Sequence, residues 1–168
     1  MINRVFLNEL QHLSGSTSYR KRLQVVTATR FRSSNSHVEL ASLIGAVLLI
    51  EMHQRPGVVR AAEWACSLLI PRILRRPITR GPLQIAEGPW DMREAINVAV
   101  QVLGSAVEDA RSQREALRCA AVAWNGAASR QPGARYGYAE VLAYAYQISM
   151  SAIHQAMLTA RTSGSRTA

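Results

Sequence analysis

Hydrophobic positions along this chain follow helical spacing rather than the alternation that is typical of strands. Apolar and polar residues alternate over no long stretch, and Ala, Leu, Arg, Glu and Gln predominate. These residues favour helices, so the pattern predicts an all-α protein. The expected helices cover residues 2–13, 38–54, 58–69, 92–103, 113–124 and 138–160. The basic segment 19–32 fits either a helix or an extended arm, and a solvated face is its simplest interpretation.

The run Val38–Ile50 is almost entirely apolar and leads directly into one carboxylate, Glu51. A bilayer-spanning helix needs about 20 residues, so this shorter run predicts a buried core helix. Ser36 and Glu39 match a capping box at its start. Burial would raise the pKa of Glu51, as a general acid requires. The alternative is a helix-end carboxylate that points to solvent or pairs with Arg55.

Two further motifs each contain a pair of residues that favours a turn or a helix end. The pair is Gly-Pro in one motif and Asn-Gly in the other. The stretch 81–85, GPLQI, predicts a turn that places the Gln84 amide between two buried side chains. There the amide would bind a sugar hydroxyl or N-acetyl group, or satisfy backbone groups. The stretch 121–126, AVAWNG, predicts a helix that Asn125-Gly126 ends, because both residues tolerate the left-handed conformation. Asp91 and Ser112 are the expected N-caps of the two helices between these motifs.

Composition and charge narrow the classes of partner. The 168 residues fit one domain, and the net charge is +9 with a single lysine, Lys21. Such an Arg-rich surface suits an anionic polymer: nucleic acid, a membrane face or an acidic wall polymer. No groove-reading motif accompanies the charge, so we do not expect nucleic acid as the partner. Cys66 and Cys119 lack the spacing of a structural zinc site, and we expect neither a metal nor a cofactor.

The order of these motifs resembles a known superfamily. A buried helix ends at Glu51, the GPLQI turn and AVAWNG follow, and Tyr138 precedes AEVLAY. This resembles the lysozyme-like superfamily, and within it the soluble lytic transglycosylases of peptidoglycan, over residues 38–146. The resemblance implies a lysozyme-like catalytic domain at 37–160, after an N-terminal helix and basic segment at 1–36 and before a flexible tail at 161–168. Its implied substrate-binding residues are Gln84, Trp124, Asn125 and Tyr138.

The resemblance also implies a mechanism with one carboxylate. Glu51 would protonate the bond between N-acetylmuramic acid and N-acetylglucosamine, and the substrate's N-acetyl group would stabilise the sugar cation. Glu51 would then deprotonate the 6-hydroxyl, which closes a 1,6-anhydro ring. Met52 and Trp124 depart from the family's usual Ser and Tyr. These departures motivate a second hypothesis, a catalytically altered protein that binds or assembles the wall.

Other members of the superfamily remain as alternatives. One alternative is a hydrolase, which would release a different product. Another is a peptidoglycan glycosyltransferase, whose motifs have a weak likeness to Glu51, Pro56-Gly57 and Arg60-Ala61. We expect no transmembrane anchor of the kind those polymerases carry. The N-terminus shows no recognisable signal peptide, although peptidoglycan lies in the periplasm or outside the cell. A secretion machine or a phage delivery system would resolve that conflict.

Overall fold

The computed structural model describes residues 2, 4–29, 38–54, 79–80, 83, 85–86, 89, 91–126 and 136–164. The elements are α1 (Arg4–Ser14), α2 (Thr17–Ala28), α3 (Leu40–Gln54), β1 (Thr79–Arg80), β2 (Ile85–Ala86), α5 (Met92–Val107), α6 (Gln113–Asn125) and α7 (Tyr138–Gly164). The described chain is thus mainly helical, which confirms the predicted class. The helix expected at 58–69 lies outside the described residues. In this part of the chain, no helix is both long and apolar enough to cross a membrane.

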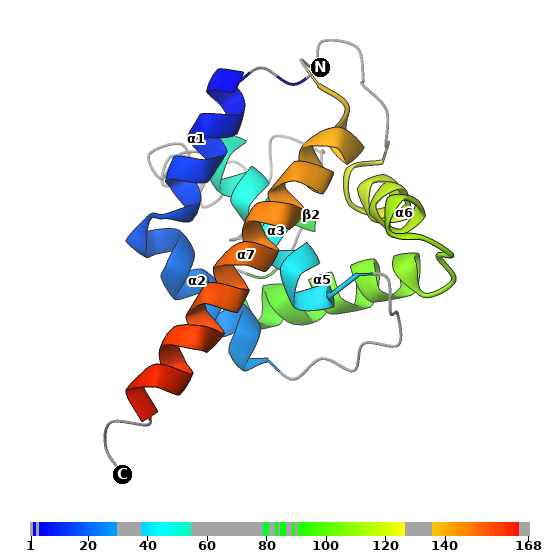
Figure 1. Cartoon of the computed structure of the whole chain (residues 1–168). Coiled ribbons are helices and arrows are strands. Elements are labelled where there is room, and N and C mark those ends of the chain that lie inside the picture. Colours follow the sequence, from blue (N-terminus) through cyan, green and yellow to red (C-terminus); the bar gives the residue numbers. More distant parts are fainter. Residues whose placement is uncertain are drawn as a thin grey trace, which may run out of the picture.

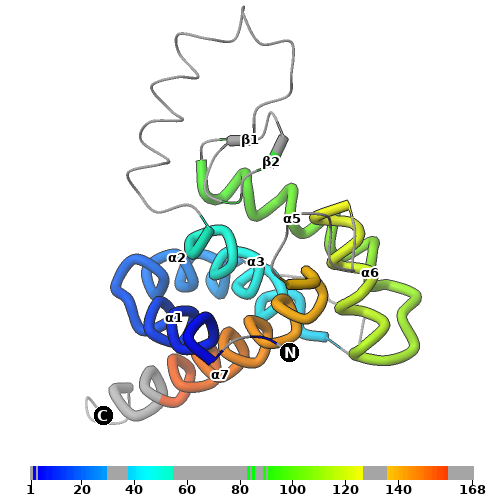
Figure 2. Tube along the Cα trace, turned by 90° about the horizontal axis from the view of Figure 1, so that it is seen from above, coloured from blue at the N-terminus to red at the C-terminus, as the bar shows by residue number. Residues whose placement is uncertain are grey.

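Helix α3 lies in the interior of the described structure. It packs against α1, α2, α5 and most extensively α7. In Figure 2, α3 lies between the α1–α2 pair and α5, and in Figure 1 the long helix α7 crosses in front of it. Twelve of the fifteen residues of α3 are buried. A helix that is apolar on every face is stable only when neighbours cover every face, which is the arrangement seen here.

The start of α3 differs from the expected capping box. The first helical hydrogen bond runs from the Leu43 N–H to the Glu39 carbonyl over 3.0 Å, so Glu39 is itself the cap residue. Its N–H donates to the Tyr146 hydroxyl on α7 over 3.0 Å, and its carboxylate accepts from the Ser42 hydroxyl over 3.1 Å. The helix therefore begins three residues later than a cap at Ser36 predicts, and Ser36 itself lies outside the described residues. A partner from a distant helix, invisible in the local sequence, satisfies the Glu39 N–H.

Helix α2 shows that the described part of the basic segment is helical, whereas residues 30–32 lie outside the described part. Residues Thr17–Ala28 are helical, and Tyr19, Leu23 and Val26 are buried. The Tyr19 hydroxyl donates to the Gly45 carbonyl on α3 over 3.2 Å. Burial raises the pKa of Tyr19 to about 12, and the nearby Ser149 hydroxyl opposes that shift in smaller measure. One face of α2 is therefore part of the core, and its basic residues occupy the other positions.

The ends of α5 and α6 follow the sequence closely. The Asp91 carboxylate accepts two N–H groups of the first turn of α5, over 2.8 and 3.0 Å. Ser112 Oγ accepts the Glu115 N–H of α6 over 3.2 Å. Gly126 ends α6 with φ of 75°. These three cap predictions are confirmed, because each depends on residues only a few positions apart.

The remaining elements depart from the sequence pattern in detail. Strands β1 and β2 pair antiparallel, with Thr79 opposite Ala86 and Arg80 opposite Ile85, so the chain reverses direction between the two strands. Leu83, between the two strands in the sequence, is fully buried. Helix α7 continues to Gly164, beyond the end expected at residue 160. No proline or glycine precedes Gly164 in that last stretch, so nothing local stops the helix earlier.

Candidate functional site

The site is built around Glu51, in the last turn of α3. Its side chain is 8% exposed, and it is the one charged side chain that is buried among the described residues. The apolar residues that precede it on α3 are almost completely buried, so this position follows directly from the run Val38–Ile50. Taking a carboxylate out of water disfavours its ionised form, which is the condition a general acid needs.

Tyr138 lies within electrostatic reach of Glu51. It is the first residue of α7 and is 7% exposed. Burial raises the pKa of Tyr138 above its ordinary value, and the charge of Glu51 raises it further. The two groups are therefore within electrostatic reach although 87 residues separate them in the sequence. The crossing of α3 with α7, which is the most extensive helix–helix contact among the described elements, produces this proximity.

The Tyr138 hydroxyl has two properties that matter for chemistry. It stays protonated over any ordinary working pH, because its pKa is raised. It is also a buried polar group for which the described part of the chain supplies no hydrogen-bond partner. Such a group usually carries a cost of about 1–3 kcal/mol, which a substrate oxygen would relieve. Glu51 and Tyr138 together thus offer an acidic group and a fixed neutral donor.

Helix α6 carries two of the other predicted site residues at its C-terminal end. Trp124 is half-buried and packs against the edge of the core, whereas Asn125 is exposed and is the last residue of α6. They stand on a different helix from Glu51 and Tyr138, and α6 packs against α7. Gln84 lies outside the described residues. The structure therefore brings Glu51 and Tyr138 together and leaves the roles of the other three as predictions.

A groove begins next to Tyr138, along the first turns of α7. It lies between α1, α6 and α7 and has a volume of about 720 Å³. Its lining combines apolar and charged residues, among them Arg114, Arg118, Glu140 and Tyr144. Arginine guanidinium groups bind carboxylates in a bidentate way, so this groove suits a ligand that carries negative charge.

Sequence patterns missed a group of four residues at the same end of the molecule. His53 Nε2 lies 2.9 Å from the Glu9 carboxylate, and the Phe6 ring packs edge-on against His53 with centroids 4.8 Å apart. The Phe6 ring also contacts Tyr136, at 5.1 Å. His53, in the last turn of α3, is thus paired with α1. No local signal could reveal this, because the pairing depends on where α1 lies.

Metal chemistry receives no support from the described residues. No group of three or more His, Cys, Asp or Glu side chains there is arranged to hold a metal ion. Cys119 is a free, half-buried thiol on α6, and Cys66 lies outside the described part. Comparison with protein-family models, curated proteins and solved structures gave no match to this chain. The site's own residues therefore carry the argument about function.

Proposed function

We propose that this protein cleaves the glycan strands of peptidoglycan as a lytic transglycosylase with a lysozyme-like fold. The observation that carries the proposal is the meeting of Glu51 and Tyr138. A buried carboxylate at the end of a buried helix lies within electrostatic reach of a buried tyrosine from the last helix. These are two of the five residues that the motif resemblance assigns to the site, and they lie far apart in the sequence.

Glu51 acts first as an acid in this mechanism. Its proton passes to the oxygen that links N-acetylmuramic acid to N-acetylglucosamine, and the glycosidic bond breaks. The substrate's N-acetyl group stabilises the resulting sugar cation. The Glu51 carboxylate then accepts the proton of the 6-hydroxyl, whose oxygen closes the 1,6-anhydro ring. One carboxyl group returns to its starting state, so neither water nor a cofactor is consumed.

A mechanism with one carboxylate fits the distribution of charge. Inverting and retaining hydrolases use a pair of carboxylates that flank the bond. Within the described ranges, Glu51 is the one carboxylate that is buried. Glu63 and Glu87, the next two carboxylates after Glu51 along the sequence, lie outside these ranges. The proposal therefore takes the transglycosylase product, for which one carboxylate is enough, and product analysis distinguishes it from a hydrolase product.

A second candidate function is supported by Met52. This residue follows Glu51 directly and is 8% exposed, so an apolar thioether occupies a position where the resembled family commonly has a serine hydroxyl. Loss of that hydroxyl would remove one hydrogen bond from the acid's surroundings. A protein with this change would bind or assemble the wall without cleaving it. Binding to sacculi without released anhydro-sugars is the result that distinguishes this candidate.

The decisive experiment replaces Glu51 by Gln in the full chain. Purified sacculi are incubated with each protein, and soluble products are examined by mass spectrometry for 1,6-anhydro ends. We expect the wild type to release anhydro-muropeptides and Glu51→Gln to lose at least about a hundredfold in rate, since the acid contributes that much or more. Glu94→Gln, an exposed carboxylate on α5, is the matched control and should retain activity.

Circular dichroism and thermal unfolding verify that each variant is folded. A fully active Glu51→Gln protein would remove Glu51 as the acid and with it the proposed mechanism. Products with reducing ends in place of anhydro ends would assign a hydrolase.

A further inference from the structure

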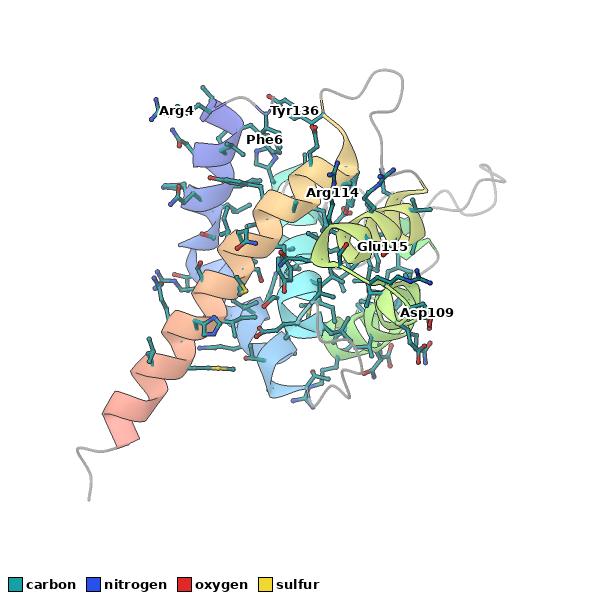
Figure 3. All side chains as sticks on the ribbon, turned by 45° about the vertical axis from the view of Figure 1, so that its right-hand side comes forward. Arg4, Phe6, Asp109, Arg114, Glu115 and Tyr136 are labelled. Carbon is teal, nitrogen blue, oxygen red and sulfur yellow. The ribbon has the colours of Figure 1, made fainter. Side chains whose placement is uncertain are left out.

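Helix α1 contacts both chain segments that carry the candidate site. Phe6 and Glu9 come from α1, His53 from the last turn of α3, and Tyr136 from the residues just before α7. We call these four residues the α1 clamp. Figure 3 shows Phe6 and Tyr136 side by side where α1 and the start of α7 come together. The clamp therefore links three segments that are distant in the sequence.

Two residues of the clamp lie close in sequence to the two site residues. His53 follows Glu51 by two positions within the same helical turn, and Tyr136 precedes Tyr138 by two positions. A shift of the last turn of α3 would move His53 and Glu51 together, because helical backbone is stiff over so short a distance. The contact of Phe6 with both His53 and Tyr136 therefore limits how far the end of α3 can move from the start of α7.

The pair formed by Glu9 and His53 is too exposed to be a large source of stability. The two side chains are 55% and 24% exposed, and exposed ion pairs contribute little to folding. Its 2.9 Å contact nevertheless fixes the direction of the imidazole ring, which is the surface against which Phe6 packs. This pair thus orients the His53 ring and contributes little to the free energy of folding.

We propose that the α1 clamp is a positioning device, in which Phe6, Glu9, His53 and Tyr136 hold the Glu51 carboxylate at a fixed place relative to the Tyr138 hydroxyl. Its consequence for catalysis rests on the function proposed above, whereas its consequence for geometry does not. Catalytic groups lose much of their effect when they are displaced by about 1 Å, so a loosened clamp should lower the rate of the chemical step.

The test uses a measurement that does not depend on activity. Glutamate carboxyl carbons are labelled with ¹³C in the full-length protein, and the Glu51 signal is assigned by its absence in Glu51→Gln. Its titration midpoint is then compared in Phe6→Leu, Glu9→Gln, His53→Ala and His53→Gln. The matched controls are Val5→Ala, a 60% exposed position on α1, and Glu94→Gln on α5.

We expect Phe6→Leu and His53→Ala to change the proton affinity of Glu51 by about threefold or more, a shift of roughly half a pH unit. His53→Gln should restore most of the wild-type midpoint, because an amide N–H replaces the ring donor to Glu9. The controls should match the wild type. Unchanged Glu51 midpoints in all clamp variants, with only the unfolding temperature lowered, would overturn the proposal and leave the clamp a purely stabilising contact.

Kinetics with sacculi then separate this proposal from the proposed function. If Glu51→Gln is inactive, Phe6→Leu should lower kcat by about tenfold with little change in KM, the pattern for misplaced catalytic groups. An equal loss in all α1 variants, Val5→Ala included, would contradict positioning. If Glu51→Gln is fully active, the proposed function fails, and the carbon titration alone still decides whether the clamp positions Glu51.

Discussion

At the scale of single residues, burial decides which groups are chemically unusual. The sequence names Glu51 and Tyr138 as candidates, and the structure adds that both are buried and lie within electrostatic reach of each other. Tyr138 gains a raised pKa from burial and from the Glu51 charge, so it is a donor that does not ionise. The same principle makes Tyr19 a buried donor, with a carbonyl partner on α3.

Tyr138→Phe tests the buried hydroxyl. Because no described group bonds it, its removal should leave the free energy of unfolding unchanged or raise it by up to about 1 kcal/mol. Release of anhydro-muropeptides should fall at the same time if the hydroxyl binds substrate. Thermal unfolding and product analysis of the same preparation provide both numbers. A stability loss of more than about 1 kcal/mol would show that the hydroxyl makes a stabilising bond.

Tyr19 predicts how stability changes at alkaline pH. The unfolded state ionises near 10.0 and the folded state near 12, so above pH 10 the unfolded chain binds fewer protons. Stability is then fully present below pH 10 and falls as the pH rises towards 12, by about 3 kcal/mol for this group. Urea unfolding at several pH values measures the slope. Tyr19→Phe should have lower stability at neutral pH but a weaker decline above pH 10.

At the scale of elements, close approach between helices is what places the site. Helix α3 contacts α2 and α7 where Gly45 has no side chain, and the Tyr19 hydroxyl bonds the Gly45 carbonyl. A methyl group at residue 45 would collide with Ser149 Oγ and would lie 2.9 Å from Leu23 Cδ1. The spacing of α3 from α7, and hence of Glu51 from Tyr138, depends on this contact.

Gly45→Ala should therefore lower the free energy of unfolding by about 1–3 kcal/mol through overpacking. Gly104→Ala on α5 is the matched control, because its nearest neighbour, Leu40 Cδ2, would lie at an ordinary 3.8 Å. That change should stabilise the protein by about 0.5–1 kcal/mol through helix propensity. Urea unfolding compares both with the wild type. Adding Ser149→Ala to Gly45→Ala should recover part of the loss, and equal effects of the two alanines would contradict the packing argument.

At the scale of the whole molecule, charge governs encounters with polymers. The net charge of +9 comes almost entirely from arginine, and the groove between α1, α6 and α7 includes Arg114 and Arg118. Long-range attraction of this kind raises the rate and extent of binding to a negative surface without choosing the bond that is cleaved. The affinity for a negative polymer should thus depend on salt concentration more strongly than the cleavage of the bond does.

Co-sedimentation with purified sacculi tests this separation. Binding should weaken severalfold between about 50 and 500 mM salt, because the screening length falls from more than 10 Å to only a few. Glu51→Gln should bind with the same salt dependence as the wild type, since the net charge of the protein is nearly unchanged. Binding that does not change with salt would assign recognition to uncharged contacts. A steeper response to duplex nucleic acid than to sacculi would instead favour the Arg-rich nucleic-acid hypothesis.

The sequence by itself determined the features that depend on near neighbours. Helical spacing predicted the fold class, the apolar run predicted the burial of α3, and Asp91, Ser112 and Gly126 marked helix ends that the structure confirms. The end of α7 and the cap of α3 were wrong by a few residues. For α3 the reason is clear, because the Tyr146 hydroxyl from another helix supplies the partner for Glu39.

Only the tertiary structure decided which distant residues meet. It placed Tyr138 within electrostatic reach of Glu51, and it joined His53 to Glu9 and Phe6. Periodicity reports which face of a helix is buried, but it carries no information on which other helix covers that face. The crossing of α3 with α7 and the position of α1 are set by packing between large apolar surfaces and by the close approach at Gly45. Those contacts define the candidate site.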